Sequence, residues 1–533
     1  MSGRSAQRTV ATAAFRASYA AIVLLVAWVS VSRDAVAAPA TPSGRVLARV
    51  REHRLSHQGT ILAEFADLLR IPNVASDSVN IRLNADRLVT MLERRGMSAR
   101  RLELPGSPPA VHGELRAPGA RRTVMLYAHY DGQPVAPKDW ASDPWTPVLR
   151  DRPVEQGGRE IPWPGDRQAI DPEARLYARS AGDDKAPIVA LLAALDALAA
   201  QGAKRSVHLK VFLEGEEEAG SPHLKSMLAA HRDQLAADAW IFCDGPMHPS
   251  RQPQLVFGVR GVMGLELTVY GPARALHSGH YGNWAPNPIA RMTDLLASLR
   301  DGDGHIRVEG FERDVRPASE AERAAFRATP DPDAALRDEL RLGGTEGGGA
   351  RLSERILLPA INFRGVRAGG VGEGAANAIP TEARASIDIR MVPDQTPAGV
   401  RAAFEDHLRR QGWHIVDAAP DSATRRGHDR IVRLEWDEGY GPYRAPLDAP
   451  FSRALAKVME ESLGRPVLLT PTLGGSLPLA HLNDVLGVPI LVLPIANHDD
   501  NQHAANENLR LQNLWDGIDV MAGLVVRLGD LWR

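Results

Sequence analysis

The sequence has a single cysteine, Cys243, among 533 residues, and it is also poor in lysine and in net charge. One thiol forms neither an internal disulfide nor a thiolate metal site, so any bound metal depends on His, Asp and Glu side chains. Only six of the 63 basic residues are lysines, and this richness in arginine is typical of a GC-rich bacterial genome. The formal charge is −2, so no basic excess points to nucleic acid as a partner.

The overall composition is that of a folded, water-exposed chain. Hydrophobic residues make up 44% and charged residues 24%, which excludes a disordered chain and a multi-span membrane protein. A chain of 533 residues is long enough for more than one domain.

The N-terminus has the three-part pattern of a secretory signal. Three arginines precede an apolar run at residues 17–31, and Ala35-Val36-Ala37 offers small residues for cleavage. The run of about 15 residues is shorter than the ~20 that span a bilayer as a helix. We therefore predict a signal peptide at 1–37 and a periplasmic or secreted bacterial protein that leaves the membrane after cleavage. The alternative is an uncleaved N-terminus that anchors the protein in the membrane.

Strands and helices alternate in the first half of the chain. Strands are predicted at 123–128, 207–213 and 239–243, with a long apolar helix at 186–200. This alternation predicts an α/β domain with a mostly parallel sheet and helices on both faces. The polar, Pro- and Gly-rich segment 152–173 is predicted to be a surface insertion.

The pattern changes near residue 259. Alternating strands at 264–270 and 383–391 and a helix capped by Thr396 predict a smaller α+β domain. Within it, segment 301–358 is an insertion with one predicted helix and a Gly-rich loop. The smaller domain therefore interrupts the larger one, and the predicted boundaries are 44–258 and 442–533 for the two parts of the larger domain and 259–441 for the smaller domain.

Histidines and carboxylates cluster where the predicted strands end. The clusters are His129-Tyr130-Asp131, Asp183-Asp184, Glu214–Glu218, Asp244 and His498–His503. The carboxyl ends of parallel strands form one rim of a sheet, so these groups can converge there. So many carboxylates at one rim need a cation, and imidazole with carboxylate suits zinc, manganese or cobalt.

Each cluster taken alone has a plainer explanation. A single His-x-Asp is common by chance, an acidic run such as Glu214–Glu218 is usually a solvated loop, and Asp244 can cap a helix. Their shared position at strand ends or helix entrances is what predicts a metal site. Asp131 can in addition hold the ring of His129 so that its other nitrogen faces the metal.

Eight short segments in order carry a resemblance to a known family. They are Leu126–Asp131, Ala181–Lys185, Glu217–Ser221, Asp244, Leu276–Gly279, Arg390–Pro393, Gly474–Pro478 and His503–Glu507. Over Gly44–Arg533 the chain resembles the carnosinase and glutamate carboxypeptidase-type family of two-zinc metallopeptidases, in its dipeptidase branch. The larger domain would then be catalytic, and the smaller one a lid and dimerisation domain.

The resemblance implies a role for each matching residue. His129 and Asp244 would bind one divalent ion, Glu218 and His503 a second, and Asp183 would bridge both. Asp131 would orient His129, and Glu217 would be the general base. Two such ions lower the pKa of a water between them, and a nearby carboxylate can then accept its proton.

Further residues would bind the substrate. The resemblance implies that Arg390 grips a substrate carboxylate, with Asn377, Gly475 and Ser476 nearby, and that His277 reaches the partner subunit of a homodimer. The plainer alternatives are an ion pair of Arg390 with a lid carboxylate such as Asp388 and a purely structural His277.

Three functions remain open. The first is a metallopeptidase acting on dipeptides or short peptides with a free C-terminal carboxylate. The second is an N-acyl amino acid amidohydrolase on the same scaffold, and the third is a non-catalytic metal- or peptide-binding protein, against which the intact Glu217 argues. The chain also departs from the family by lacking glycine at Ala178, Ser180 and Ala186, so the loop before Asp183 is expected to take a different path.

Overall fold

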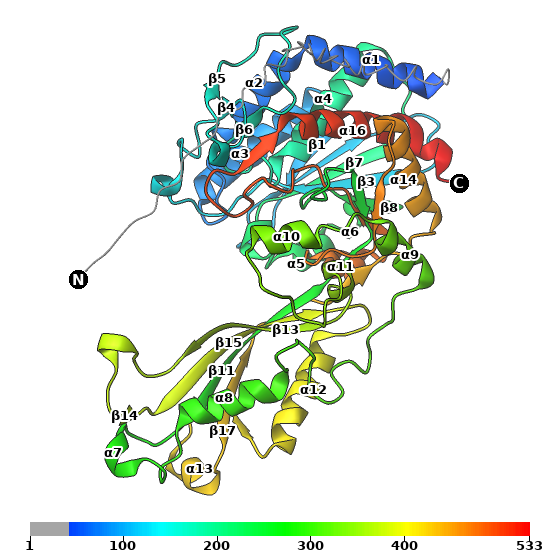
Figure 1. Cartoon of the computed structure of the whole chain (residues 1–533). Helices are drawn as coiled ribbons and strands as arrows, with labels where there is room; N and C mark the ends of the chain where they lie inside the picture. The colour runs from blue at the N-terminus through cyan, green and yellow to red at the C-terminus, as the bar shows by residue number, and fades with distance from the viewer. Residues whose placement is uncertain (1–41) are drawn as a thin grey trace, which may run out of the picture. The chain divides into compact units, whose positions relative to one another are not determined.

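An eight-stranded sheet organises the larger part of the protein in this computed structural model, which describes residues 42–533 (Figure 1). The order across the sheet is β1 (Ser98–Leu102), β2 (Ala110–Leu115), β7 (His208–Glu214), β3 (Thr123–His129), β8 (Ala239–Phe242), β20 (Ile490–Val492), β9 (Gln254–Val256) and β19 (Leu468–Thr470). The four central strands β7, β3, β8 and β20 are parallel, whereas antiparallel pairings join β1 to β2, β2 to β7 and β20 to β9. The predicted sheet is thus confirmed in its centre.

Helices cover both faces of this sheet, as predicted. On one face pack α1 (Pro42–Ser56), α2 (Gln58–Leu69), α3 (Ser78–Glu93), α4 (Lys185–Ala200), α14 (Pro450–Leu463) and α16 (Leu511–Leu531). On the other face pack α5 (Leu224–Ala230), α6 (Arg232–Leu235) and α15 (Leu479–Leu486). The side chains of β3 explain why both faces are covered. Leu126 and Ala128 point to the core under the first set of helices, and Met125 and Tyr127 point to the core under the second set.

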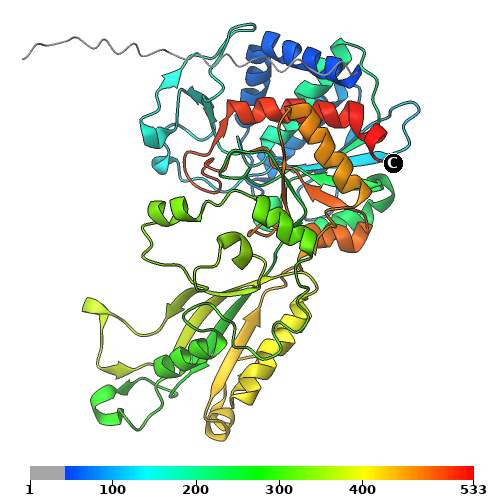
Figure 2. The same ribbon diagram turned by 45° about the vertical axis from the view of Figure 1, so that its right-hand side comes forward.

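A five-stranded sheet forms the smaller part. Its order is β13 (Ala360–Arg367), β15 (Glu382–Met391), β11 (Gly261–Tyr270), β17 (Ile431–Trp436) and β16 (His414–Val416). Helices α8 (Pro288–Leu299) and α12 (Pro397–Arg410) pack against it, as Figure 2 also shows. Leu265, Leu267 and Val269 point into this core. On the opposite face Glu266 is exposed but Thr268 and Tyr270 are buried, so the predicted alternation holds for the inward-facing residues only.

The two predicted insertions contain more structure than the sequence indicated. Segment 152–173 is mostly exposed but contributes β5 (Glu160–Ile161) to a small sheet with β4 (Val148–Arg150), β6 (Arg175–Tyr177) and β21 (Asn508–Arg510). Segment 301–358 contains the predicted helix as α9 (Glu320–Ala328), and also α10 (Asp333–Glu339) and α11 (Leu352–Arg355).

Other predictions on domains and location are not tested. The signal peptide at 1–37 lies outside the described residues. Residues 42–533 belong to one compact unit, so the boundaries near residues 258 and 441 stay predictions. Within residues 42–533, none of the helices has both the length and the apolar character needed to cross a membrane.

Candidate metal centre

Two histidines face the two oxygens of one carboxylate, Asp183. His129, the last residue of β3, places Nε2 2.9 Å from Asp183 Oδ1. His503, in the loop after β20, places Nε2 3.2 Å from Asp183 Oδ2. Asp183 comes directly before Asp184, which is the N-cap residue of α4. Each oxygen therefore faces a different imidazole, which is the arrangement that a bridging ligand requires.

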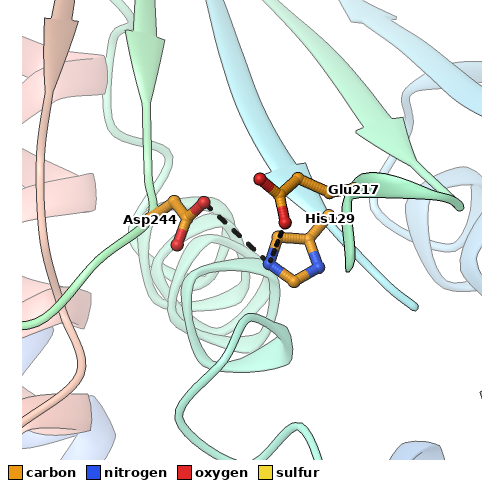
Figure 3. Close-up of side chains that lie close together, drawn as sticks. All are labelled: His129, Glu217 and Asp244. Carbon is orange, nitrogen blue, oxygen red and sulfur yellow. Dashed lines mark ion pairs between the residues drawn. The ribbon is translucent and has the colours of Figure 1, made fainter. Parts of the chain in front are cut away.

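The first group of possible ligands joins three neighbouring strand ends (Figure 3). His129 ends β3, Glu217 follows β7 and Asp244 follows β8, and β3 lies between the other two strands. His129 Nε2 is 4.0 Å from Glu217 Oε2 and 4.0 Å from Asp244 Oδ2. One donor atom from each residue lies within 4.8 Å of the others, so a cation held by His129 and Asp244 would lie beside the Glu217 carboxylate.

The second group forms around Glu218. Its Oε2 lies 3.1 Å from His503 Nε2 and accepts a hydrogen bond of 2.9 Å from Gln133 Nε2. Gln502 donates in the same way to Asp183 Oδ2 at 2.8 Å. The neighbours Glu217 and Glu218 occupy a single 3-10 turn, Glu217–Ala219, and their carboxylates turn to different groups.

Asp131 connects the His129 ring to this turn. Its Oδ1 lies 3.4 Å from His129 Nδ1, on the side of the ring away from Asp183. The same carboxylate accepts the backbone N–H groups of Glu217 at 3.1 Å and of Glu218 at 3.0 Å. One buried side chain thus positions three of the candidate residues.

The pKa shifts in the centre reflect several buried carboxylates lying close together. Burial raises the pKa of Asp244 to about 7 and raises the pKa of Glu217 well above its usual range. Hydrogen bonds to Asp183 and Glu218 raise the pKa of His503 to about 10. Buried carboxylates that resist ionisation are stabilised by a cation. The imidazole and carboxylate donors therefore fit divalent ions such as zinc or manganese.

Glu507 is an organising residue to which the sequence analysis assigned no role. Its side chain is 1% exposed and accepts from Arg179 Nη1 at 2.7 Å. It also accepts the backbone N–H groups of Ser180, Gly182 and Asp183 at 2.9–3.0 Å. Glu507 thereby determines the path of the loop that presents Asp183. The available signal was its place at the end of the His503–Glu507 segment.

One of the three positions that lack the family's glycine takes a left-handed backbone conformation, whereas the path of the loop relative to the family stays a prediction. Of Ala178, Ser180 and Ala186, only Ser180 has a positive φ, at 63°. Its hydroxyl accepts from Asn73 Nδ2 at 2.9 Å, and its N–H is held by Glu507. These bonds support a left-handed conformation that a non-glycine residue disfavours.

The sequence of residues 125–527 matches the model of peptidase family M20/M25/M40. The chain belongs to this family. It is 24% identical over 493 residues to the Cys-Gly metallodipeptidase of Schizosaccharomyces pombe, covering 90% of this chain and 95% of the relative. It is 25% identical over 434 residues to the human Beta-Ala-His dipeptidase, covering 80% of this chain and 78% of the relative. The resemblance found in the sequence is confirmed, and this M20 protein is a metallopeptidase.

Solved structures show the same fold. An M20 family metallo-carboxypeptidase from Sulfolobus solfataricus superimposes with a TM-score of 0.72 at 25% identity, covering 88% of this chain and 99% of that chain. Human carnosine dipeptidase 1 superimposes with a TM-score of 0.70 at 22% identity, covering 91% of this chain and 99% of that chain.

Arg390 in this M20 peptidase lies between two partners. Its Nη1 donates to Ser476 Oγ at 2.7 Å, and its Nε donates to Asp388 Oδ2 at 2.9 Å. The ion pair considered as an alternative is therefore present, together with the predicted Gly475-Ser476 loop. Tyr440, which the sequence did not single out, links this region to the metal centre: burial raises its pKa, Glu217 adds to the rise, and Arg390 opposes it.

His277 and Asn377 lie elsewhere. They adjoin each other on β12 (Leu276–His277) and just before β14 (Ala378–Ile379), where Ser278 N donates to Asn377 O at 2.9 Å. This is the end of the β11–β15 pair at which Tyr270 opposes Glu382, whereas Arg390 opposes Val262 at the other end. Eight residues at ~3.4 Å each separate those ends by about 27 Å. The expectation that Asn377 lies near Arg390 is therefore not met within one chain.

Proposed function

We propose that this M20 peptidase is an exported metallo-dipeptidase or carboxypeptidase that uses two divalent ions, zinc, manganese or cobalt, to hydrolyse peptides with a free C-terminal carboxylate. The observation that carries the proposal is Asp183, whose two oxygens face His129 and His503 separately. Asp244 completes the donor set on the His129 side and Glu218 on the His503 side. The dipeptidase names of two relatives support the substrate class.

The reaction assigns a separate task to each residue. Bound divalent ions would lower the pKa of a water and polarise the scissile carbonyl. Glu217 would accept the proton of the attacking water, because its carboxylate lies beside the candidate metal ligands and burial, which raises its pKa, makes it a stronger base. Asp131 would keep His129 and the Glu217 turn in place through the contacts described above. Arg390 would bind the substrate carboxylate with its planar guanidinium.

A complete site would require a second copy of the chain. Arg390 and His277 stand at opposite ends of one strand pair, so a dipeptide cannot touch both within one subunit. His277 is exposed, and its Nδ1 accepts only the local N–H of Gly279 at 3.1 Å, which leaves Nε2 available. We infer a homodimer in which His277 donates a hydrogen bond to the oxyanion formed in the partner's site.

The second candidate is an N-acyl amino acid amidohydrolase. Its substrates also carry a carboxylate next to the scissile amide, so the same metal donors and Arg390 would serve. The two functions differ in whether a free α-amino group is needed.

The test is a substrate panel on the mature protein with measured metal content. We expect about two divalent ions per chain, cleavage of dipeptides in preference to their N-acetylated forms, and loss of activity on chelation. Glu217→Gln should keep the metal and lower kcat by roughly 10²–10⁴-fold. Glu216→Gln is the matched control, because its carboxylate faces His223 at 2.9 Å instead of the metal groups. An active, metal-free protein would refute the proposal, and preference for N-acylated substrates would favour the amidohydrolase.

A further inference from the structure

A cavity of about 350 Å³ lies between the 301–358 insertion and strand β13. Its lining is mainly aliphatic and comes from α10, α11, the Gly-rich loop and the strand. The principal apolar residues are Leu336, Leu340, Leu342, Leu352, Ile356 and Ile361. Leu340, Leu342 and Leu352 are exposed by 49–60%, so the insertion presents apolar surface that its own folding does not bury.

This cavity adjoins the residues that would bind the substrate carboxylate. Ala360, one of its lining residues, pairs directly with Arg390 across β13 and β15. Directly opposed residues of antiparallel strands direct their side chains to the same face. The cavity therefore lies at the edge strand β13 beside the Ala360–Arg390 pair, and it also reaches Ile361, whose side chain points to the opposite face of the strand.

The Gly474–Ser476 loop adjoins both the cavity and Arg390. Arg260, which also lines the cavity, donates from Nε to Gly474 O at 2.8 Å and from its backbone N–H to Gly475 O at 3.2 Å. A Cβ placed on Gly474 would lie 3.3 Å from Ile356 Cγ2 and 3.9 Å from Arg260 Nη2, so both of these lining residues adjoin the loop on the same side. The insertion therefore packs against the same loop whose Ser476 contacts Arg390.

The lining carries more positive than negative charge, because it contains four arginines, Arg260, Arg300, Arg337 and Arg355, and the two carboxylates of Asp333 and Glu346. Arg300 is neutralised by Glu346 at 2.6 Å. Within residues 42–533, no carboxylate oxygen lies within 4 Å of the guanidinium nitrogens of the other lining arginines, Arg260, Arg337 and Arg355. A basic side chain in the cavity would meet these charges, whereas an aliphatic or aromatic side chain would bury its surface against the leucines.

We propose that this cavity is the subsite for the side chain of the substrate's C-terminal residue, selecting large apolar side chains and rejecting lysine and arginine. The inference rests on the proposed function, because it takes Arg390 as the group that holds the C-terminal carboxylate. With the carboxylate at Arg390, the attached side chain has this cavity beside it. The insertion then determines which peptides the enzyme accepts.

The experiment compares Ala-Gly, Ala-Leu and Ala-Lys on the metal-loaded wild type and on Ala350→Trp. Ala350 lines the cavity and is remote in sequence from the catalytic groups, so a bulky side chain there should fill the space. We expect wild-type kcat/KM to be highest for Ala-Leu and lowest for Ala-Lys. In Ala350→Trp, the value for Ala-Leu should fall at least 10-fold through KM, with Ala-Gly within 2-fold of wild type. Ala335→Trp is the control, because Ala335 is an exposed residue of α10 outside the lining.

A charge reversal gives an independent readout. Arg337→Glu changes an exposed residue and should raise kcat/KM for Ala-Lys at least 5-fold while leaving Ala-Gly unchanged. The subsite is refuted if Ala350→Trp lowers kcat/KM equally for all three substrates, or if neither variant changes the order of the three kcat/KM values. The peptidase assignment stands in both cases. If wild type cleaves none of the three peptides, the proposed function itself fails.

Discussion

Glu507 allows a quantitative test of how the Asp183 loop is held. Its two oxygens accept four hydrogen bonds, and Oε2 takes those from Arg179 and Ser180. Oε1 takes those from Gly182 and Asp183. Glu507→Gln keeps the shape but directs an NH₂ group at two donors. One lost charge-assisted bond is worth about 1.5–3 kcal/mol, and a buried unsatisfied donor about 1–3 kcal/mol.

The sum agrees with the ~3–5 kcal/mol lost when one partner of a buried ion pair is removed. Arg179 and Glu507 are 2% and 1% exposed, so solvent cannot compensate for the lost charge. We expect Glu507→Gln to lower the free energy of unfolding by about 3–5 kcal/mol. Because Glu507 also positions Asp183, metal affinity should fall roughly 10–100-fold.

The assay is urea denaturation at pH 8, where a carboxyl with a pKa of about 6 is ionised, together with metal titration. Glu461→Gln is the matched control: Glu461 is paired with Arg527 at 3.0 Å with both side chains 29% exposed, so the loss there should be below about 1 kcal/mol. Adding Arg179→Met to the Glu507→Gln protein should raise its free energy of unfolding by at least about 1 kcal/mol, because the second substitution removes the unpaired charge of Arg179. A Glu507→Gln protein as stable as the Glu461→Gln control would refute the reasoning.

Three further predictions concern the substrate site and stability. Arg390→Met should lower kcat/KM for free-acid dipeptides by an amount equivalent to about 2–5 kcal/mol, but should barely change kcat/KM for C-terminally amidated analogues. Equal losses of kcat/KM for both substrate types would make Arg390 structural. Mixed dimers of His277→Ala with Glu217→Gln should regain activity because one site is then complete, and verified heterodimers without activity would place the whole site in one chain. Although burial opposes it, Arg175 lowers the pKa of Asp499, so Asp499→Asn should destabilise by about 1 kcal/mol at pH 7, allowing for solvent screening. This difference should begin to shrink as pH falls below ~4, the ordinary pKa of aspartate, and is lost fully only as pH approaches the lowered pKa of the folded state; thermal unfolding from pH 7 to 3 can follow the decline.

The chemistry of the centre was predictable from the sequence because it depends on local order. Strand periodicity located the ends of β3, β7 and β8, and parallel strands bring such ends to one rim. The residue types that follow them, His129, Glu217 and Asp244, then predict a cation site. The family resemblance added the assignment of His503 and Asp183, which lie far apart in the chain.

Tertiary structure alone decided where the remaining groups meet. Glu507 reaches Arg179 across 328 residues of sequence, and no periodic pattern encodes such a pairing. Asn377 was expected beside Arg390, but the ten-residue register of β11 with β15 places them at opposite ends. The cavity beside Ala360 arises because the 301–358 insertion folds against the Gly474 loop. Periodicity reports which side of an element is buried, whereas the partner on that side is selected by long-range packing.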